Sequence, residues 1–541
     1  MKLLKAIHTN KMAPAFPYVL VLALTLISLW PFFRSGFFET HDGDWMIIRF
    51  SAFHQALVDG QFPVRFVDRL NNNYGYPVLN FLYPLPFYLA EIPKILGFGF
   101  VQSIKLVFVA STIASSTFMY WALSRLFSKK ASIVGAVLYV WVPYRFLDIY
   151  VRGSVGESLA FAFIPLVLGS IFLIQRNKKF YYPMLSLSTA FLILSHNVIA
   201  VMFLPILFLI SLVIDPSRII KTFLAFTIGL ILSAFFWLPA LYDIQFVILS
   251  RIKISNVEQH LVSLKSLVIP SWGYGPTPSN GDFFSPQLGM VTITVLLFSI
   301  IFILKKKLND KLSKLLIVIS IFVVFMLHKV SLPLWTNIPL IDTIQFPWRA
   351  LSIVVFSSSI LASMLVEKIN KNFVTIFIVI FAILLSSPYT HPKNFVQRDE
   401  GFYSTNEDTT TVRDEYLPIW VQEKPNQRAY EKLVIIGKGN IASQEIKNAS
   451  YKADINLQEN STIKVNTIFF PGWQVFANGK TLSINVIEKT GLISFELPKG
   501  EHKVIIDYNR TGIHLVSELL SLLALIVISV QFYLWRKQNS L

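Results

Sequence analysis

The first residues that could carry chemistry are Glu39, His41, Asp42 and Asp44, which directly follow the first long apolar run of the chain. Carboxylates and an imidazole at the place where a membrane helix meets water are costly to hold beside hydrocarbon. Such a cluster is therefore a functional-site hypothesis by default. A carboxylate in this setting could act as a general base, whereas the plain alternative is a solvated loop.

The element that would position these groups is a short helix over residues 44–58. The spacing of its apolar residues predicts an amphipathic helix that ends before Gly60 and Pro63. We expect it to lie along the membrane surface rather than to cross the membrane. Asp42 would stand in its first turn or cap, and Arg49 follows seven residues later. Both side chains then point to about the same side, so that an acid and a base face one space.

Composition identifies the class of protein. The chain has 541 residues, of which 54% are hydrophobic, and apolar runs recur along it. Runs of about 18 residues or more are typical of a multi-spanning membrane protein, which excludes a soluble enzyme. The absence of cysteine excludes disulfide and thiolate chemistry. The formal net charge is +17, but the basic residues fall mainly between apolar runs, which favours membrane topology over nucleic-acid binding as its cause.

Charge bias predicts the topology. The lysines before the first apolar run place the N-terminus in the cytoplasm, so that the acidic segment lies outside. Residues 76–100 are interrupted by four prolines, which predicts a re-entrant or interfacial piece. Residues 181–214 form either two short spans or one tilted helix. The twelve predicted spans are 17–34, 102–127, 131–150, 157–175, 181–196, 197–214, 219–240, 287–304, 312–330, 347–366, 372–387 and 513–535.

Three regions follow from this topology. Residues 1–387 form a transmembrane domain with its first outer loop at 35–101, and residues 512–541 form the last transmembrane helix and a basic tail. Between them, residues 388–511 contain fifteen Lys/Arg and fifteen Asp/Glu. Their alternating apolar pattern, with turn signals such as Asn478-Gly479, predicts a small extracytoplasmic β-sandwich.

Several arginines break the positive-inside pattern, because they fall outside or at the outer edge of a span. The planar guanidinium fork matches phosphate oxygens, so a group of them predicts an anionic ligand such as a lipid phosphate. The alternative is snorkelling or local ion pairing, for example of Arg152 with Glu157. His196-Asn197 would form a ligand-facing pair or a hydrogen-bonded helix end. No spacing of the nine histidines resembles a zinc ligand set. The arginines are Arg49, Arg65, Arg69, Arg145, Arg152 and Arg349.

Short motifs along nearly the whole chain resemble one group of polytopic membrane proteins. They include Thr40-His41-Asp42-Gly43, Gly60-x-x-Pro63-x-Arg65, Arg152-Gly153-x-x-x-Glu157, Ser195-His196-Asn197 and Phe346-Pro347-Trp348-Arg349. The resemblance is to the 6-pyruvoyl-tetrahydropterin synthase-related and YfhO-like membrane proteins, which are similar in plan to GT-C glycosyltransferases. Pterin chemistry is not implied, because the soluble pterin enzyme depends on a zinc-binding histidine set that is absent here.

The resemblance implies a GT-C-like fold, to which the twelve predicted spans would belong, and a transferase at the outer face. The donor would be a polyprenyl-phosphate sugar, and the acceptor a glycan, lipid or protein. Transfer would be inverting, with Asp42 as general base and Asp44 as the reserve, and a divalent cation (Mg²⁺ or Mn²⁺) would bind between them if the reaction uses one. The expected substrate-binding residues are His41, Arg49, Arg65, Arg69, Arg152, Glu157, His196, Asn197 and Arg349.

The competing class is a flippase or other transporter of a lipid-linked saccharide, in which the same arginines would hold a phosphate. The spans show no evident inverted repeat and no paired acidic residues at mid-membrane, features that a coupled transporter more often has. We therefore expect a transferase.

Overall fold

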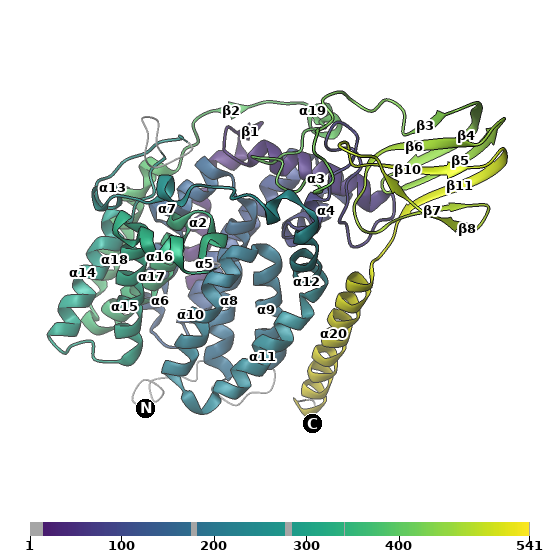
Figure 1. Cartoon of the computed structure of the whole chain (residues 1–541). Coiled ribbons are helices and arrows are strands. Elements are labelled where there is room, and N and C mark those ends of the chain that lie inside the picture. Colours follow the sequence, from purple (N-terminus) through teal and green to yellow (C-terminus); the bar gives the residue numbers. More distant parts are fainter. Residues whose placement is uncertain (1–14, 175–180, 276–283, 340, 540–541) are drawn as a thin grey trace.

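The computed structural model describes residues 15–174, 181–275, 284–339 and 341–539, which form a body of helices with a β-sandwich at one end (Figure 1). The longer helices of the body are α2 (Ala15–Ser28), α5 (Phe100–Leu123), α6 (Lys129–Val140), α8 (Val155–Ile174), α9 (Tyr181–Ser195), α10 (Asn197–Ile214), α11 (Ile219–Leu232), α12 (Ala234–Asp243), α14 (Met290–Leu304), α15 (Lys311–Leu327), α17 (Leu351–Ile369), α18 (Asn372–Ser386) and α20 (Gly512–Asn539). Shorter helices are α7 (Pro143–Phe146), α13 (Leu264–Val268) and α16 (Leu332–Asn337).

The described helices fit a multi-spanning membrane protein. Six of them are long and apolar enough to cross a membrane. The number of candidate spans rises to nine if each of three bent helix pairs is counted as one span. The bends are 44° after α6, 68° between α11 and α12, and 85° after α15. Each of the twelve predicted spans coincides with one of the six long helices, with one of the three bent pairs, or with one of the shorter apolar helices α2, α9 and α14. The membrane class is thus confirmed, while the number of spans stays a prediction.

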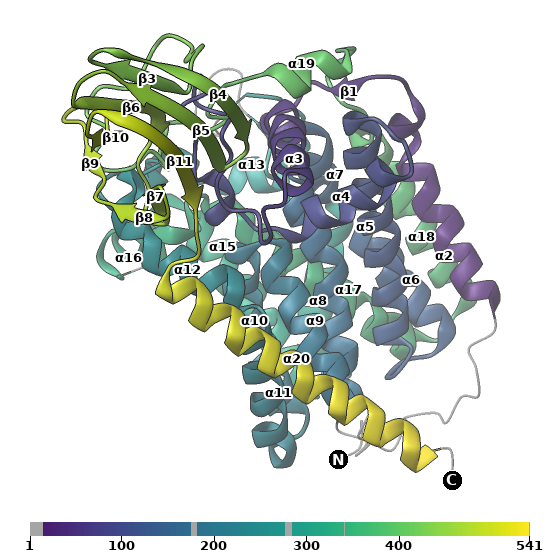
Figure 2. The same cartoon turned by 90° about the vertical axis from the view of Figure 1, so that its right-hand side faces the viewer.

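The two ends of the helical body differ. The sandwich and the first outer loop lie at one end, and the basic connections between α10 and α11 and between α14 and α15 lie at the other (Figure 1). Helix α20 leaves the sandwich and runs back along the body toward the basic end (Figure 2). This is the separation that charge bias requires if the sandwich is outside.

The first outer loop contains α3 (Gly43–Val58) and α4 (Leu85–Ile95). The predicted helix before Gly60 is confirmed, but it is not a solvent-facing surface helix. The segment from β2 (Phe395–Val396) to α19 (Glu400–Thr405) crosses the loop, and β2 pairs with β1 (Phe37–Phe38). The hydroxyl of Ser51 donates to the carbonyl of Tyr403, 2.5 Å away, so that α3 is covered from the outside. Helix α4 has eleven residues, a rise of about 16 Å, and is too short to cross a membrane.

The C-terminal domain is a sandwich of two antiparallel sheets. Its strands begin at Leu433, and residues 388–432 instead run over the outer loop. Strand β5 alternates buried and exposed residues, and one apolar core joins both sheets. Asn478 and Gly479 have φ of 52° and 78°, as the predicted hairpin turn requires. One sheet is β3 (Leu433–Ile436), β6 (Ser461–Ile468), β10 (Leu492–Leu497), β9 (Asn485–Val486); the other is β4 (Gly439–Lys447), β5 (Ser450–Leu457), β11 (Gly500–Tyr508), β7 (Trp473–Ala477), β8 (Lys480–Leu482).

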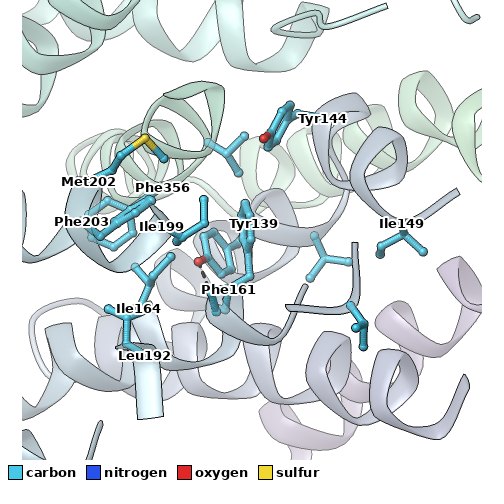
Figure 3. Close-up of a cluster of buried hydrophobic side chains, with 14 of the residues drawn as sticks. Tyr139, Tyr144, Ile149, Phe161, Ile164, Leu192, Ile199, Met202, Phe203 and Phe356 are labelled. Atoms are coloured by element: carbon cyan, nitrogen blue, oxygen red, sulfur yellow. Dashed lines mark hydrogen bonds between the residues drawn. The ribbon is translucent and has the colours of Figure 1, made fainter. Parts of the chain in front are cut away.

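The helices that carry the candidate site share one apolar core. Tyr139 of α6, Phe161 of α8, Leu192 of α9 and Phe203 of α10 are buried together, and the Tyr139 hydroxyl donates to the Phe161 carbonyl at 3.0 Å (Figure 3). Tyr144 of α7 lies at the edge of this cluster (Figure 3). Since such cores are close-packed, the cluster fixes these helices relative to one another.

Candidate functional site

The site is built on an irregular turn between α7 and α8. Residues Leu147–Arg152 form a π-helical turn, a rare conformation that often occurs at functional sites. Gly153 ends it with a φ of 69°, in the left-handed region that glycine adopts without cost. The turn brings three charged side chains together, those of Arg145, Asp148 and Arg152, and all three are buried.

These side chains form a buried ion cluster with Glu157 and Arg349. Arg152 Nη1 donates to Asp148 Oδ1 at 2.8 Å and also binds Glu157. The Nε of Arg349 lies 3.8 Å from the Glu157 carboxylate, and Arg145 lies 3.6 Å from Asp148. Three guanidinium groups against two carboxylates leave one positive charge. A buried cluster of this net charge favours an anionic ligand.

Several hydrogen-bond donors in and beside this cluster lack an acceptor. Within the described part of the chain, Trp348 Nε1, Arg349 Nε and both Nε and Nη1 of Arg145 are buried and have no hydrogen-bond partner. The Trp348 ring lies 4.6 Å from the guanidinium carbon of Arg152, and Arg349 Nε lies 3.8 Å from the Glu157 carboxylate that Arg152 binds. A buried donor without an acceptor costs roughly 1–3 kcal/mol. The cluster is thus complementary to a ligand that is rich in acceptor oxygens.

Asp42 is attached directly to the π-helical turn. Its backbone N–H donates to the Arg152 carbonyl at 2.8 Å, and that of His41 donates to the Val151 carbonyl at 3.0 Å. The Asp42 side chain is half-buried, and its carboxylate makes no hydrogen bond to any residue that the structure describes. Its charge is close enough to act on Arg152 and Arg349. An unengaged carboxylate beside a cationic cluster is available for proton transfer.

Gly153 permits this attachment. A Cβ at Gly153 would lie 2.4 Å from Thr40 Oγ1 and 3.1 Å from the Gly43 nitrogen. Thr40 Oγ1 in turn accepts a hydrogen bond from the Gly43 N–H at 3.0 Å. The segment that carries Asp42 therefore reaches the π-helical turn only because residue 153 has no side chain.

The other two residues of the acidic segment face different partners. Asp44 is held by Arg398 at 3.1 Å and by the Tyr403 hydroxyl at 3.1 Å, so it fastens the covering segment to α3. His41 is exposed, and its Nε2 lies 3.0 Å from the Tyr274 carbonyl. A cation bridging Asp42 and Asp44 would have to displace Arg398. The described residues contain no group of three or more histidine or acidic side chains that could hold a metal ion.

Three of the predicted substrate-binding arginines bind other parts of the chain. Arg49 donates to the carbonyl and the hydroxyl of Thr410, the latter at 2.9 Å. Arg69 binds the carbonyl of Ser404 and the hydroxyl of Ser51. Arg65 donates to Asn80 at 3.1 Å and lies 3.4 Å from Glu518 of α20. These three fasten the outer loop to later segments, whereas Arg152 and Arg349 converge at the ion cluster.

His196 reaches the cluster, and Asn197 does not. His196 caps α10, accepting from the Ile199 N–H at 3.3 Å, and its ring stacks on Tyr83 with centroids 4.8 Å apart. His196 lies close enough to Arg349 and Glu157 for their charges to act on it. Burial and then the Asp42 charge raise the pKa of Tyr83 to about 12. Asn197 is exposed and bonds only the next backbone N–H.

Sequence reasoning overlooked Asp148, Trp348 and Tyr83. Asp148 had a signal, because it lies three residues after Arg145 and four before Arg152, and such neighbours share a helix face. Trp348 stands beside a predicted site residue, but its unpaired N–H depends on tertiary packing. Nothing local distinguishes Tyr83 from the other aromatic residues of its proline-rich segment.

The fold and site thus define a polytopic membrane protein with a charged cluster beneath its sandwich-bearing end. Residues 79–392, more than half of the chain, match the 6-pyruvoyl-tetrahydropterin synthase related domain, which is described as a membrane protein. The chain belongs to this family, which confirms the prediction made from its motifs.

Further similarities are more distant. An uncharacterised protein of Lactococcus lactis subsp. cremoris (strain MG1363) is 25% identical over 243 residues, which are 42% of this chain and 40% of that protein. The structure of the arabinofuranosyltransferase AftD from mycobacteria is similar with a TM-score of 0.45 and 11% sequence identity. The match covers 72% of this chain and 28% of the AftD chain. A mutant of that protein gives a TM-score of 0.45 and 14% identity, over 71% of this chain and 29% of its own. The matched regions therefore span 40% of the Lactococcus protein and less than a third of the arabinofuranosyltransferase.

Proposed function

We propose that this protein is a membrane glycosyltransferase that moves a sugar from a polyprenyl-phosphate donor to an acceptor hydroxyl at the sandwich-bearing, outer face. The observation that carries the proposal is the pairing of two features. One is Asp42, an unengaged carboxylate hydrogen-bonded through its backbone to Arg152. The other is a net cationic cluster with unpaired donors on Trp348 and Arg349.

The reaction follows from these groups. Asp42 takes the proton of the acceptor hydroxyl as that oxygen attacks the anomeric carbon from the face opposite the phosphate. The bond between the anomeric carbon and the phosphate oxygen breaks, and its electron pair leaves on the polyprenyl phosphate, so that the configuration inverts. A positioned general base contributes about 10²- to 10⁴-fold. Arg349, Arg152 and the Trp348 N–H would stabilise the charge that develops on the leaving phosphate.

The buried ion pairs give the cluster its rigidity. Arg152 is held by both Asp148 and Glu157, so it has little freedom to follow a ligand. The Nε of Arg349 approaches Glu157 only to 3.8 Å and makes no hydrogen bond within the described residues, so this donor is available to a phosphate. We therefore assign Arg349 and Trp348 to direct phosphate contact and Arg152 to orienting the cluster. Preorganised donors of this kind need no rearrangement during the reaction.

The test is the Asp42→Asn variant, purified in lipid and supplied with a polyprenyl-phosphate sugar. The amide retains the volume of the carboxylate but cannot take a proton, so we expect transfer to fall by about 10²-fold or more while donor affinity is nearly unchanged. Asp44→Asn is the matched control and should lose far less activity. An Asp42→Asn enzyme with a near wild-type rate would remove the proposed base and favour a transporter of lipid-linked saccharides.

A further inference from the structure

A second, polar cavity lies between the start of α3 and the segment that covers the outer loop. Its volume is about 290 Å³, and its lining includes Trp45, Asn71, Asn72, Glu407, Asp408 and Asp414. Neither the ion cluster nor Asp42 forms part of this lining. The cavity is therefore a separate site that the donor-binding groups do not explain.

The lining is rich in hydrogen-bond acceptors. Asn71 is 1% exposed, and among the described residues its Oδ1 is buried without a hydrogen-bond partner. Two of the three carboxylates form ion pairs, Glu407 with Arg428 at 2.9 Å and Asp414 with Lys424 at 2.7 Å, and each keeps capacity for further hydrogen bonds. Carboxylate and amide oxygens accept hydrogen bonds, so the complementary ligand must supply several donors.

The backbone around the cavity is held in place. Asn71, Asn72 and Asn73 are consecutive left-handed residues with φ of 60°, 55° and 65°, a conformation that asparagine tolerates better than most residues. The Asn72 N–H donates to the Glu407 carbonyl at 3.0 Å, and Arg49 holds Thr410 from the other side. A cavity fixed in this way is formed before its ligand arrives, as is usual for small-molecule sites.

We propose that this cavity binds the sugar end of the acceptor. The inference rests on the proposed transferase function and names the class of its second substrate as a neutral saccharide. Sugar hydroxyls supply the donor that Asn71 Oδ1 lacks and additional donors for the carboxylates, and the ring of Trp45 supplies an apolar surface for the sugar face. The lining carries three carboxylates against the single ammonium group of Lys424, a balance that disfavours a phosphate. No three of the described acidic or histidine side chains are placed to hold a metal ion.

The position of Trp45 connects the cavity to the proposed base. Asp42 caps α3 and Trp45 stands three residues later, so their Cβ atoms lie about 5–6 Å apart on neighbouring positions of one helix face. A saccharide in contact with Trp45 therefore has a hydroxyl within reach of the Asp42 carboxylate. The donor phosphate would approach Asp42 from Arg152, whose carbonyl accepts the Asp42 N–H and whose guanidinium does not line the cavity.

The experiment measures saccharide binding without transfer. The full-length protein in nanodiscs is titrated with the methyl glycosides of glucose, galactose, mannose, rhamnose and arabinofuranose, and binding is followed by saturation-transfer NMR. We expect at least one glycoside to bind. Asn71→Gly, which suits the left-handed backbone and removes the amide, should weaken it by about tenfold. Asn73→Gly has the same backbone setting but does not line the cavity, and it should bind as the wild type does.

A second pair of variants tests the contribution of the Trp45 ring to saccharide binding. Trp45→Leu should weaken binding by about tenfold or more, whereas Tyr430→Leu removes an aromatic ring that is 86% exposed and should have no effect. Failure of all five glycosides to bind, or equal binding by Asn71→Gly and the wild type, would overturn the proposal. Asp42→Asn should retain binding. Saccharide binding without any transfer activity would preserve the cavity assignment and reject the transferase function, so the two proposals fail separately.

Discussion

Replacement of Gly153 by alanine tests whether the attachment of Asp42 to the π-helical turn matters for function. The new Cβ would lie 2.4 Å from Thr40 Oγ1, so the two atoms would have to separate by about 1 Å to reach an ordinary contact of 3.4 Å. That movement displaces the segment from Thr40 to Gly43 and hence the Asp42 carboxylate. A misplacement of about 1 Å can cost on the order of 10²-fold in rate.

The same variant also has a backbone cost. Alanine in the left-handed region costs roughly 1–2 kcal/mol, which would lower the thermal midpoint but leave the protein folded in lipid. Gly479→Ala is the matched control, because Gly479 has a φ of 78° and a Cβ there meets no atom within 4 Å. It shares the backbone cost without the clash.

Transfer from a polyprenyl-phosphate sugar and the thermal midpoint should therefore be measured together for both variants. We expect kcat/KM to fall by about 10²-fold in Gly153→Ala and to stay near the wild-type value in Gly479→Ala. A fully active Gly153→Ala enzyme would refute the claim that this close approach sets the position of Asp42. Equal losses of kcat/KM in the two variants would mean that the effect comes from reduced stability alone.

Two more predictions concern the donor and the topology. Arg349→Ala should lower affinity for a polyprenyl-phosphate sugar by about 10- to 100-fold, since a charge-assisted hydrogen bond contributes roughly 1.5–3 kcal/mol. Arg65→Ala, which breaks the contact with Glu518, should leave that affinity unchanged. Calorimetric titration of both variants with the donor makes the comparison. A wild-type donor affinity in Arg349→Ala would mean that this arginine is structural. In this cysteine-free chain, a membrane-impermeant maleimide should label Glu445→Cys only from outside and Lys305→Cys only from the cytoplasm, and the reverse pattern would contradict the topology.

Local sequence patterns predicted the elements well, because hydropathy and alternation are local properties. The helices that coincide with the predicted spans follow apolar runs, and the strands near Thr462 and Leu492 follow period-two alternation. The helix after Asp42 was also foreseen, but its burial was not. Its cover, α19, lies some 350 residues later in the chain, as the contact between Ser51 and Tyr403 shows.

The division of the arginines could not be predicted from sequence for the same reason. Arg49 binds Thr410, 361 residues away, and Arg65 approaches Glu518, 453 residues away. Charge bias identified the outer arginines as a group, but only tertiary packing separates those that fasten the loop from Arg152 and Arg349. The pair of Arg152 and Glu157, in contrast, is close in sequence and was weighed as a local ion pair.

The most direct test of the central claim is a cryo-EM map of the protein in lipid with a polyprenyl-phosphate analogue bound. We expect the phosphate to lie in contact with Arg349 and the Trp348 Nε1, beside Arg152, with Asp42 facing the sugar position from the sandwich-bearing end. A phosphate bound at the basic end of the helical body, or along a path between the helices away from Asp42, would contradict this expectation.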